Sequence, residues 1–204
     1  MMNKRKVLYI SGTRADYGLM KSTLSTIDNH KNLNLNIAVC GMHLMKEFGV
    51  TVDEIKKDGF NIWKIPVIYE KDNRRSMAEF TGKFIQLLSY GIEKIKPDVI
   101  LLLGDRGEML AGAVVGAYSG ILTVHIHGGE VTSTVDEFAR HAITKLSHIH
   151  LCATQNAKAR IIKMGEEPSR VYVVGAPGLD EIQNTKLYGK KEIEKFYRLD
   201  LSKP

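Results

Sequence analysis

The amino-acid sequence predicts an α/β protein with a doubly wound parallel sheet, as in Rossmann-like folds. Short apolar runs alternate with helical stretches along all 204 residues, and this alternation is typical of right-handed β–α–β crossovers. The run at 99–103 is apolar throughout, as expected of a strand buried on both faces. A chain of this length buries about 70% of its unfolded surface, which is enough for one good core.

The expected elements follow one another in a regular order. Apolar or alternating runs predict strands at 6–10, 33–40, 62–68, 99–103, 122–127, 150–153 and 171–174. Apolar residues at helical spacing predict helices at 20–27, 42–48, 51–57, 77–95, 109–118, 135–147, 156–164 and 190–197. Pro66 interrupts the third strand run, and Pro97 closes the longest helix.

Composition narrows the class of partner. The chain is 44% hydrophobic and 25% charged, with a formal net charge of +6, which is typical of a soluble globular protein. Its basic residues are scattered, without a basic block interleaved with aromatics. We therefore expect an anionic small ligand rather than nucleic acid.

From the apolar runs we expect neither a membrane span nor a signal peptide. We find no apolar run of about 18 residues, so we expect no membrane span, and the apolar run at 7–10 is too short for a signal peptide. Cys40 and Cys152 lie far apart, without metal or redox spacing. This cysteine usage fits a reducing cytoplasm.

Three loops at the carboxyl ends of predicted strands carry polar side chains, and this edge binds ligands in open α/β sheets. The first loop, 11–18, leads into a helix, so backbone amides and the Arg14 guanidinium suit a phosphate. It lacks the G-x-G-x-x-G pattern of nicotinamide sites. The alternative is a tight turn in which Asp16 caps the helix. His43 follows the next strand and could line the same cleft.

The second loop is 104–106, directly after the buried strand. That position holds the Asp105 carboxylate rigidly at the sheet edge, which suits a catalytic acid or base. Equally, Asp105 could be a helix N-cap paired with Arg106.

The third loop follows the strand at 122–127 and is rich in histidine. His125 and His127 lie two apart on this strand and should share one face, and His148 and His150 repeat the spacing. Such pairs can bind a metal, but no cysteine or carboxylate cluster completes a set, so no metal is expected. Glu130 follows two glycines that would let it approach a ligand.

The helix after this loop begins with two acids, Asp136 and Glu137. Either they serve the site, or they favour the positive end of a helix that Ser133 or Thr134 caps. In the second case ordinary i,i+4 pairs are expected on the helix. These pairs are Asp136 with Arg140 and Glu137 with His141.

Taken together, these loops resemble the hydrolysing UDP-N-acetylglucosamine 2-epimerases of the bacterial sialic-acid type. Four segments occur in the order typical of that family, and the similarity extends to residues 175–178 and covers essentially the whole chain. The segments are Ser11-Gly12-Thr13-Arg14-Ala15-Asp16-Tyr17-Gly18, Gly104-Asp105-Arg106, His125-Ile126-His127-Gly128-Gly129-Glu130 and Arg140-His141-Ala142-Ile143-Thr144-Lys145.

The resemblance implies a glycosyltransferase-B-like enzyme whose active site lies between two Rossmann-like halves. We expect residues 1–185 to be the first half and 186–204 to be a crossover helix and linker to a second half. On this reading the chain is a fragment without turnover of its own, and the full-length enzyme forms a homo-oligomer.

In the reaction that the resemblance implies, a base removes the C2 proton of the UDP-sugar and UDP leaves, giving a 2-acetamidoglucal. Water then adds with the opposite C2 stereochemistry and releases N-acetylmannosamine. The expected partner is a UDP-sugar, and no cofactor is expected because the elimination needs neither nicotinamide nor metal.

The matching positions give an expected site. Asp105 and Asp136 match the family's carboxylates, whereas Arg14 and Asp16 match its N-terminal ligand motif. The expected catalytic residues are Asp105, Asp136, Glu130 and His127. The expected substrate-binding residues are Arg14, Asp16, His43, His125 and Arg140. The histidines tied to activity in the animal relatives match His125, His148 and His150.

Two departures leave alternatives open. Other branches have a glutamate where this chain has His127 and a lysine where it has Leu19, so either His127 or Glu130 does the work of that glutamate. Both departures are compatible with a branch that uses UDP-2,4-diacetamido-trideoxyhexose for legionaminic acid. Competing functions are a metal hydrolase using the His-x-His pairs and a non-catalytic nucleotide-sugar binding module.

Overall fold

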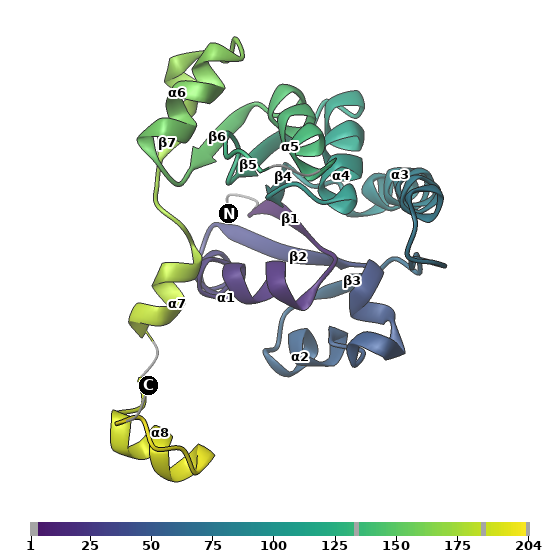
Figure 1. The fold of residues 1–204 in the computed structure, drawn as a ribbon. Helices are drawn as coiled ribbons and strands as arrows, with labels where there is room; N and C mark the ends of the chain where they lie inside the picture. The colour runs from purple at the N-terminus through teal and green to yellow at the C-terminus, as the bar shows by residue number, and fades with distance from the viewer. Residues whose placement is uncertain (1–3, 133–134, 185–186, 203–204) are drawn as a thin grey trace.

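A single parallel sheet forms the centre of the structure (Figure 1). The structure, a computed structural model, describes residues 4–132, 135–184 and 187–202. Over these residues seven strands pair in the order β3-β2-β1-β4-β5-β6-β7. The strands are β1 (Arg5–Ser11), β2 (Leu33–Val39), β3 (Ile62–Lys64), β4 (Val99–Leu103), β5 (Leu122–Ile126), β6 (Ile149–Cys152) and β7 (Val171–Val173). The order reverses between β1 and β4, which confirms the predicted doubly wound fold.

Helices cover both faces of this sheet (Figure 1). Helices α1 and α2 pack on one face, α3, α4 and α5 pack on the other, and α6 packs against β6 and β7. The helices are α1 (Arg14–Asp28), α2 (Val52–Lys57), α3 (Arg74–Ile95), α4 (Gly107–Tyr118), α5 (Val135–Leu146), α6 (Gln155–Lys163), α7 (Gly178–Asn184) and α8 (Lys190–Tyr197). None of these described helices combines the length and hydropathy that a membrane crossing requires.

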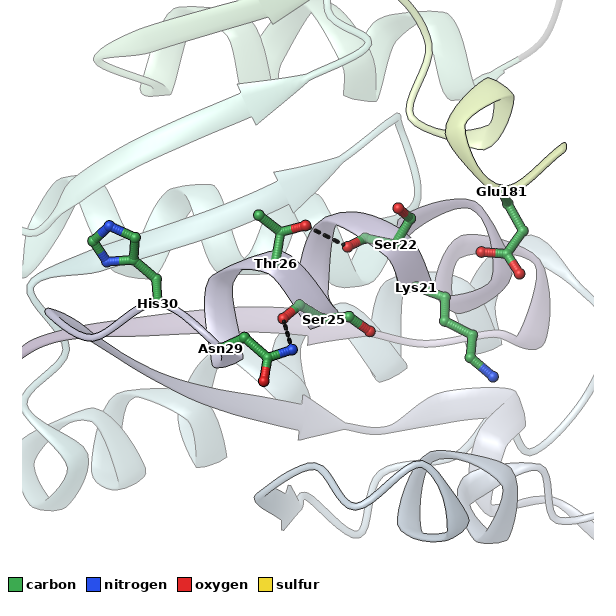
Figure 2. Close-up of a pocket in the computed structure, with 7 residues that line it drawn as sticks. All are labelled: Lys21, Ser22, Ser25, Thr26, Asn29, His30 and Glu181. Atoms are coloured by element: carbon green, nitrogen blue, oxygen red, sulfur yellow. Dashed lines mark hydrogen bonds between the residues drawn. The ribbon is translucent and has the colours of Figure 1, made fainter. Parts of the chain in front are cut away.

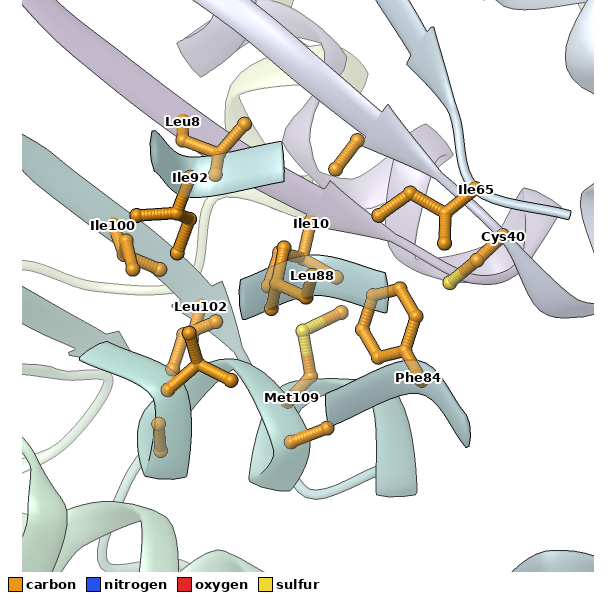
Figure 3. Packing of buried hydrophobic residues seen from close by; sticks show 14 of the residues in the cluster. Leu8, Ile10, Cys40, Ile65, Phe84, Leu88, Ile92, Ile100, Leu102 and Met109 are labelled. Carbon is orange, nitrogen blue, oxygen red and sulfur yellow. The ribbon is translucent and has the colours of Figure 1, made fainter. Parts of the chain in front are cut away.

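Successive residues of β1 serve two separate cores, because side chains alternate across a strand. Leu8 and Ile10 face α3 and α4 and pack in one cluster with Phe84 (Figure 3). Val7 and Tyr9 belong to the cluster under α1 and α2. The sheet is therefore buried on both sides, and its ligands must approach it from an edge.

Two sequence predictions differ from the structure, and one helix was missed. The third strand stops at Lys64, since Pro66 has no amide proton to continue the ladder. The predicted helix at 42–48 is instead two short 3-10 turns, Gly41–Leu44 and Lys46–Phe48. Helix α7 was not predicted; it packs against α1.

Candidate functional site

Loops after β1, β4 and β5 emerge at the carboxyl edge of the sheet, where the strand order reverses. Four of the predicted residues come together there. They are Asp105, His127, Asp136 and Arg140.

An ion pair between Asp105 and Arg140 is at the centre of this group. An Nη2 hydrogen of Arg140 is donated to Oδ2 of Asp105, and both side chains are largely buried. Burial raises the pKa of Asp105, Arg140 opposes this effect, and the nearby Asp136 carboxylate adds to it. A carboxyl group in this setting can hold a proton more readily than an exposed aspartate.

The alternative pairing of Asp105 with Arg106 is wrong. Arg106 itself occupies the N-cap position of α4, and its Nε donates to Glu108 Oε1 at 3.1 Å. Glu108 is fully buried and also accepts from the Tyr69 hydroxyl at 3.1 Å. Glu108 is not among the residues predicted from sequence, although the Arg106-Gly107-Glu108 spacing at a helix start was a signal for it.

His127 lies just beyond the end of β5 in the left-handed conformation, with φ at +61°. The prediction that His125 and His127 share a strand face is therefore wrong, because the strand ends at Ile126 and the backbone turns at His127. Its Nε2 is buried without a hydrogen-bond partner among the described residues. Burial lowers the pKa of His127, Arg140 adds to this effect, and Glu130 and Asp105 oppose it. The neutral imidazole is thus available as a base.

Unpaired polar atoms gather around the β5–α5 connection. Over the described residues, six buried side-chain nitrogen or oxygen atoms lack a partner, and five of them belong to residues between 127 and 141. Those five are His127 Nε2, Thr132 Oγ1, Arg140 Nε, Arg140 Nη1 and His141 Nδ1. Because buried polar groups normally find partners, this concentration points to a ligand that supplies them.

The His125 side chain contacts Gly104 and Thr144 and is not a member of this group. Its side chain is fully buried; Nε2 donates to the Gly104 carbonyl at 2.7 Å, and Nδ1 lies 3.2 Å from Thr144 Oγ1. Gly104 has a φ of +81° and directly precedes Asp105. His125 therefore fixes the turn that presents Asp105, and both of its ring nitrogens are engaged within the protein.

The Asp16 side chain holds the first loop, 11–18, together through hydrogen bonds. Its carboxylate is buried and accepts from the amides of Gly12 and Thr13 and from the hydroxyls of Ser11, Thr13 and Tyr9. The N-cap of α1 is Thr13, which forms a capping box with Asp16. Asp16 is therefore not the N-cap that the alternative expected; Thr13 is, and Asp16 completes the capping box from the third helical position. Its carboxylate is turned into the protein rather than toward a ligand.

His43 extends this inward network. Ser11 donates to Asp16 at 2.6 Å, so His43 Nε2 donates to Ser11 at 2.9 Å, and Nδ1 accepts from Thr51 at 2.7 Å. The imidazole is fully buried, and burial lowers its pKa to about 4. The structure thus places His43 below the loop, where it supports Asp16 and does not line a cleft.

Two other predicted residues lie outside this group. Arg14 is exposed and lines a cleft of about 350 Å³ together with Tyr17 and Lys57. Glu130 is half-buried, and its carboxylate lies 3.5 Å from the Thr154 hydroxyl at the start of α6. The charge of Glu130 acts on His127, so Glu130 is close to the site without sharing the Asp105–Arg140 pair.

The helix-end alternative for α5 is tested only in part, since Ser133 and Thr134 lie outside the described residues. Glu137 accepts from the Thr132 amide at 2.8 Å and lies 3.9 Å from His141, which agrees with the expected pair. Arg140, in contrast, reaches across to Asp105.

The histidine spacing does not assemble a metal site. Among the described residues no group of three or more histidine, cysteine or acidic side chains is arranged to hold a metal ion. His148 Nδ1 accepts from the Thr123 amide at 3.1 Å, and His150 Nε2 lies 3.2 Å from Glu166. Neither side chain contacts His127, so the two His-x-His pairs do not converge on one point over the described part of the chain.

A cleft of about 480 Å³ adjoins the group, and Arg106 and Asp136 line it. A separate depression of about 580 Å³ runs along α1 (Figure 2). The Thr26 and Asn29 side chains that line it donate to backbone carbonyls of their own helix, and its wall contains none of the predicted site residues that the structure describes. We therefore place the candidate site at the sheet edge.

Comparison with known proteins decides the family. Residues 25–203 match the profile of the family described as UDP-N-acetylglucosamine 2-epimerase. The chain belongs to the UDP-N-acetylglucosamine 2-epimerase family. A curated relative from Legionella pneumophila, named UDP-N,N'-diacetylbacillosamine 2-epimerase (hydrolyzing), is 46% identical over 200 residues, which is 98% of this chain and 53% of the relative. The UDP-N-acetylglucosamine 2-epimerase of Neisseria meningitidis serogroup B is 39% identical over 195 residues.

The chain spans about half the length of the curated relatives of this epimerase family that it matches. Solved structures agree on the fold. A crystal structure of a UDP-N-acetylglucosamine 2-epimerase superposes with a TM-score of 0.81 at 20% identity, over 95% of this chain and 55% of that one. The Neisseria meningitidis enzyme bound to UDP-GlcNAc gives 0.77 at 22% identity, over 97% and 54%. The predicted Rossmann-like half of a glycosyltransferase-B-type fold is confirmed.

Proposed function

We propose that this chain is the N-terminal half of a hydrolysing 2-epimerase that acts on a UDP-linked 2-acetamido sugar. The observation that carries the proposal is the group of unpartnered buried atoms on His127 and Arg140 beside the Asp105–Asp136 carboxylates. Cationic donors suit a leaving diphosphate, and the imidazole and carboxylates suit proton transfer at carbon. The names of the relatives supply the substrate class.

Inversion at C2 needs two groups, because one proton leaves one face of the sugar and another returns on the opposite face. We assign removal to the neutral imidazole of His127. The proton removed from C2 passes to a ring nitrogen of His127 as the C1–O bond breaks and UDP departs. The raised pKa of Asp105 suits the returning proton, which adds to C2 as water oxygen adds to C1.

Arg140 has two roles in this scheme. One guanidinium nitrogen holds Asp105, and the other two are buried without a hydrogen-bond partner among the described residues. Since an oxygen-rich diphosphate is a strong acceptor for guanidinium donors, we assign these nitrogens to the leaving UDP.

Two sugars fit the class. One is UDP-N-acetylglucosamine, giving N-acetylmannosamine for sialic-acid-type biosynthesis; the other is the UDP-2,4-diacetamido-trideoxyhexose named for the Legionella relative. We further propose that a second half, of the length that the relatives carry, completes the cleft, so that the 204-residue chain alone shows no steady turnover. A homo-oligomer of that full-length enzyme remains a prediction.

We also place the enzyme in the cytoplasm. Cys40 and Cys152 are both free and buried, which supports a reducing compartment.

The test is Asp105→Asn in the complete enzyme, since asparagine keeps the size of the side chain and removes its proton chemistry. We expect UDP release and solvent deuterium incorporation at C2 to fall about 10²- to 10⁴-fold, with UDP-sugar binding retained. The exposed Asp28 on α1 provides the control variant Asp28→Asn, which should keep full turnover. Unchanged turnover in Asp105→Asn would refute the assigned role.

A further inference from the structure

The turn at residues 127–130, which follows β5, has a strained backbone. His127 has a φ of +61° and Gly129 a φ of +78°, so two of its first three residues lie in the left-handed region. A residue with a Cβ is disfavoured there, and the conformation persists only where the surrounding structure imposes it. Because we assign proton removal to His127, whatever imposes this conformation bears on the reaction.

Helix α6 is the element on which this turn packs. The Gly129 backbone approaches α6 so closely that a Cβ at this position would lie 2.5 Å from the Ala157 carbonyl oxygen and 2.8 Å from the Ile161 side chain. Both of these α6 side chains are fully buried. Residue 129 must therefore be glycine for reasons of space as well as of φ, and the position of the turn depends on α6.

Arg160, in the last turn of α6, makes a polar contact with the same residue. Its Nη1 donates to the Gly129 carbonyl oxygen, 31 residues earlier in the chain. A charged donor forms a stronger hydrogen bond than a neutral one. At the other end of α6, the hydroxyl of the N-cap residue Thr154 lies 3.5 Å from the Glu130 carboxylate. The two ends of this helix thus contact two successive residues of the turn.

The contact with Arg160 completes a restraint on His127. The His127 amide donates to the Leu151 carbonyl of β6 at 3.0 Å, which holds the turn before Gly128, and Arg160 holds it after Gly128. Without Arg160 the second restraint is lost, and the His127 ring can shift. A displacement of about 1 Å at a catalytic group can cost about 10²-fold in rate.

We propose that Arg160 is a positioning residue, which acts through the Gly129 carbonyl to hold the His127 imidazole where it can remove the C2 proton of the sugar. The inference rests on the proposed function. Arg160 bonds to the backbone of the turn, so its effect on the reaction passes through His127. This role needs a cationic donor at the end of a long side chain, and lysine should fill it in part.

The first measurement is kcat and KM of the complete enzyme for the UDP-sugar that it turns over. We expect Arg160→Met to lower kcat about 10- to 100-fold. KM should change by less than about twofold, because the groups assigned to the diphosphate are unaltered. Arg160→Lys should recover most of the lost kcat. Lys163→Met removes an exposed cation from the same helix; it is the matched control and should behave like the unmodified enzyme.

Amide hydrogen exchange in the 204-residue chain tests the restraint without substrate. In Arg160→Met the His127 amide should exchange about 10-fold faster, because the turn opens more often. The Ile37 amide donates to the Asn61 carbonyl at 2.9 Å on the other side of the sheet, and its rate should not change. A residue that contributes only to global stability would accelerate exchange at both amides and leave kcat unchanged in the folded enzyme.

The outcomes separate this inference from the proposed function. Unchanged kcat or unchanged His127 exchange in Arg160→Met overturns the positioning role and leaves the epimerase function standing. A loss of kcat in Arg160→Lys as large as in Arg160→Met also overturns it. Turnover of neither UDP-sugar by the unmodified complete enzyme overturns the proposed function, and the role of Arg160 in catalysis falls with it. Thermal unfolding shows whether each variant folds; Arg160→Gln, with a shorter polar side chain, replaces Arg160→Met if the latter does not.

Discussion

The Arg140 guanidinium donates to the Asp105 carboxylate across 35 residues of sequence, joining the start of α4 to α5. The pair brings a positive and a negative charge to the sheet edge in a largely buried setting. Asp105 is nevertheless left with a raised pKa, so burial and the neighbouring Asp136 outweigh the arginine. Such a balance is sensitive to any change at Arg140.

Arg140→Met should therefore raise the pKa of Asp105 further, because the substitution removes the main effect that lowers it. The Asp105 carboxyl can be followed by NMR as a function of pH in the 204-residue chain. In the complete enzyme, turnover should fall by about 10²-fold or more, since the leaving group loses its donors.

Arg75→Met is the control for this prediction. Arg75 pairs with Glu79 on the exposed surface of α3, where an ion pair contributes about 0–1 kcal/mol. An Asp105 titration that is the same in Arg140→Met as in the unmodified chain would contradict the assigned balance of charges.

Two buried histidines should make the protein less stable in mild acid. Burial lowers the pKa of His43 to about 4 and of His125 to about 3, whereas an unfolded histidine has a pKa of about 6.5. As the pH falls below about 6.5, these two histidines take up protons in the unfolded chain but stay neutral in the folded chain. The free energy of unfolding should then fall by about 1.4 kcal/mol per pH unit for each histidine, down to about pH 4 for His43 and pH 3 for His125.

Urea unfolding at pH 7, 6 and 5 measures this slope. Asp16 and Asp105, whose pKa values are raised by burial, act in the opposite direction, so the informative quantity is the difference between chains. His43→Gln should be less stable at pH 7 and should show a shallower loss toward pH 5. His30→Gln, at an exposed position, should keep the original slope; a parallel slope in His43→Gln would contradict the prediction.

The sheet was predictable from sequence because burial on both faces leaves continuous apolar runs, as at β4 (Val99–Leu103). The conformation of the loops was harder to predict from sequence. His125 and His127 have the same spacing as two strand residues, and only the left-handed turn at His127 separates their environments. Similarly, the spacing offered Asp16 as a capping residue but did not show that its carboxylate accepts from five donors.

The sequence predicted which loops carry the site residues, but not which of these residues contact one another. Sheet topology brings the ends of β4 and β5 together, so the proximity of Asp105 to the loop after β5 follows from the fold. The partner of Asp105 did not follow from local spacing, since i,i+4 geometry offered Asp136 to Arg140 and the structure pairs Arg140 with Asp105. Long-range pairing of this kind depends on side-chain packing that local patterns do not encode.

His127→Gln in the complete enzyme should reduce turnover by about 10²- to 10⁴-fold, because the neutral base is lost. His127→Glu should recover part of the activity, since a carboxylate can accept the same proton from this position, and its pH profile should shift toward lower pH. Both variants keep a residue with a Cβ in the left-handed conformation, so thermal unfolding should change little. Full activity in His127→Gln would transfer the role of base to another group, with Glu130 the first to test.

Gly12→Ala should disturb the first loop, because a Cβ at Gly12 would lie 2.0 Å from the Glu108 carboxylate oxygen. Glu108 would have to move away from Arg106 and Tyr69, and overpacking of this kind costs about 1–3 kcal/mol. Gly18→Ala is the matched control: Gly18 lies inside α1 with open space around its Cβ position, and alanine there should stabilise the protein by about 0.5–1 kcal/mol. Denaturant unfolding of the two variants should thus give changes of opposite sign. Equal stability of Gly12→Ala and the unmodified chain would mean that Glu108 is free to leave its buried contacts.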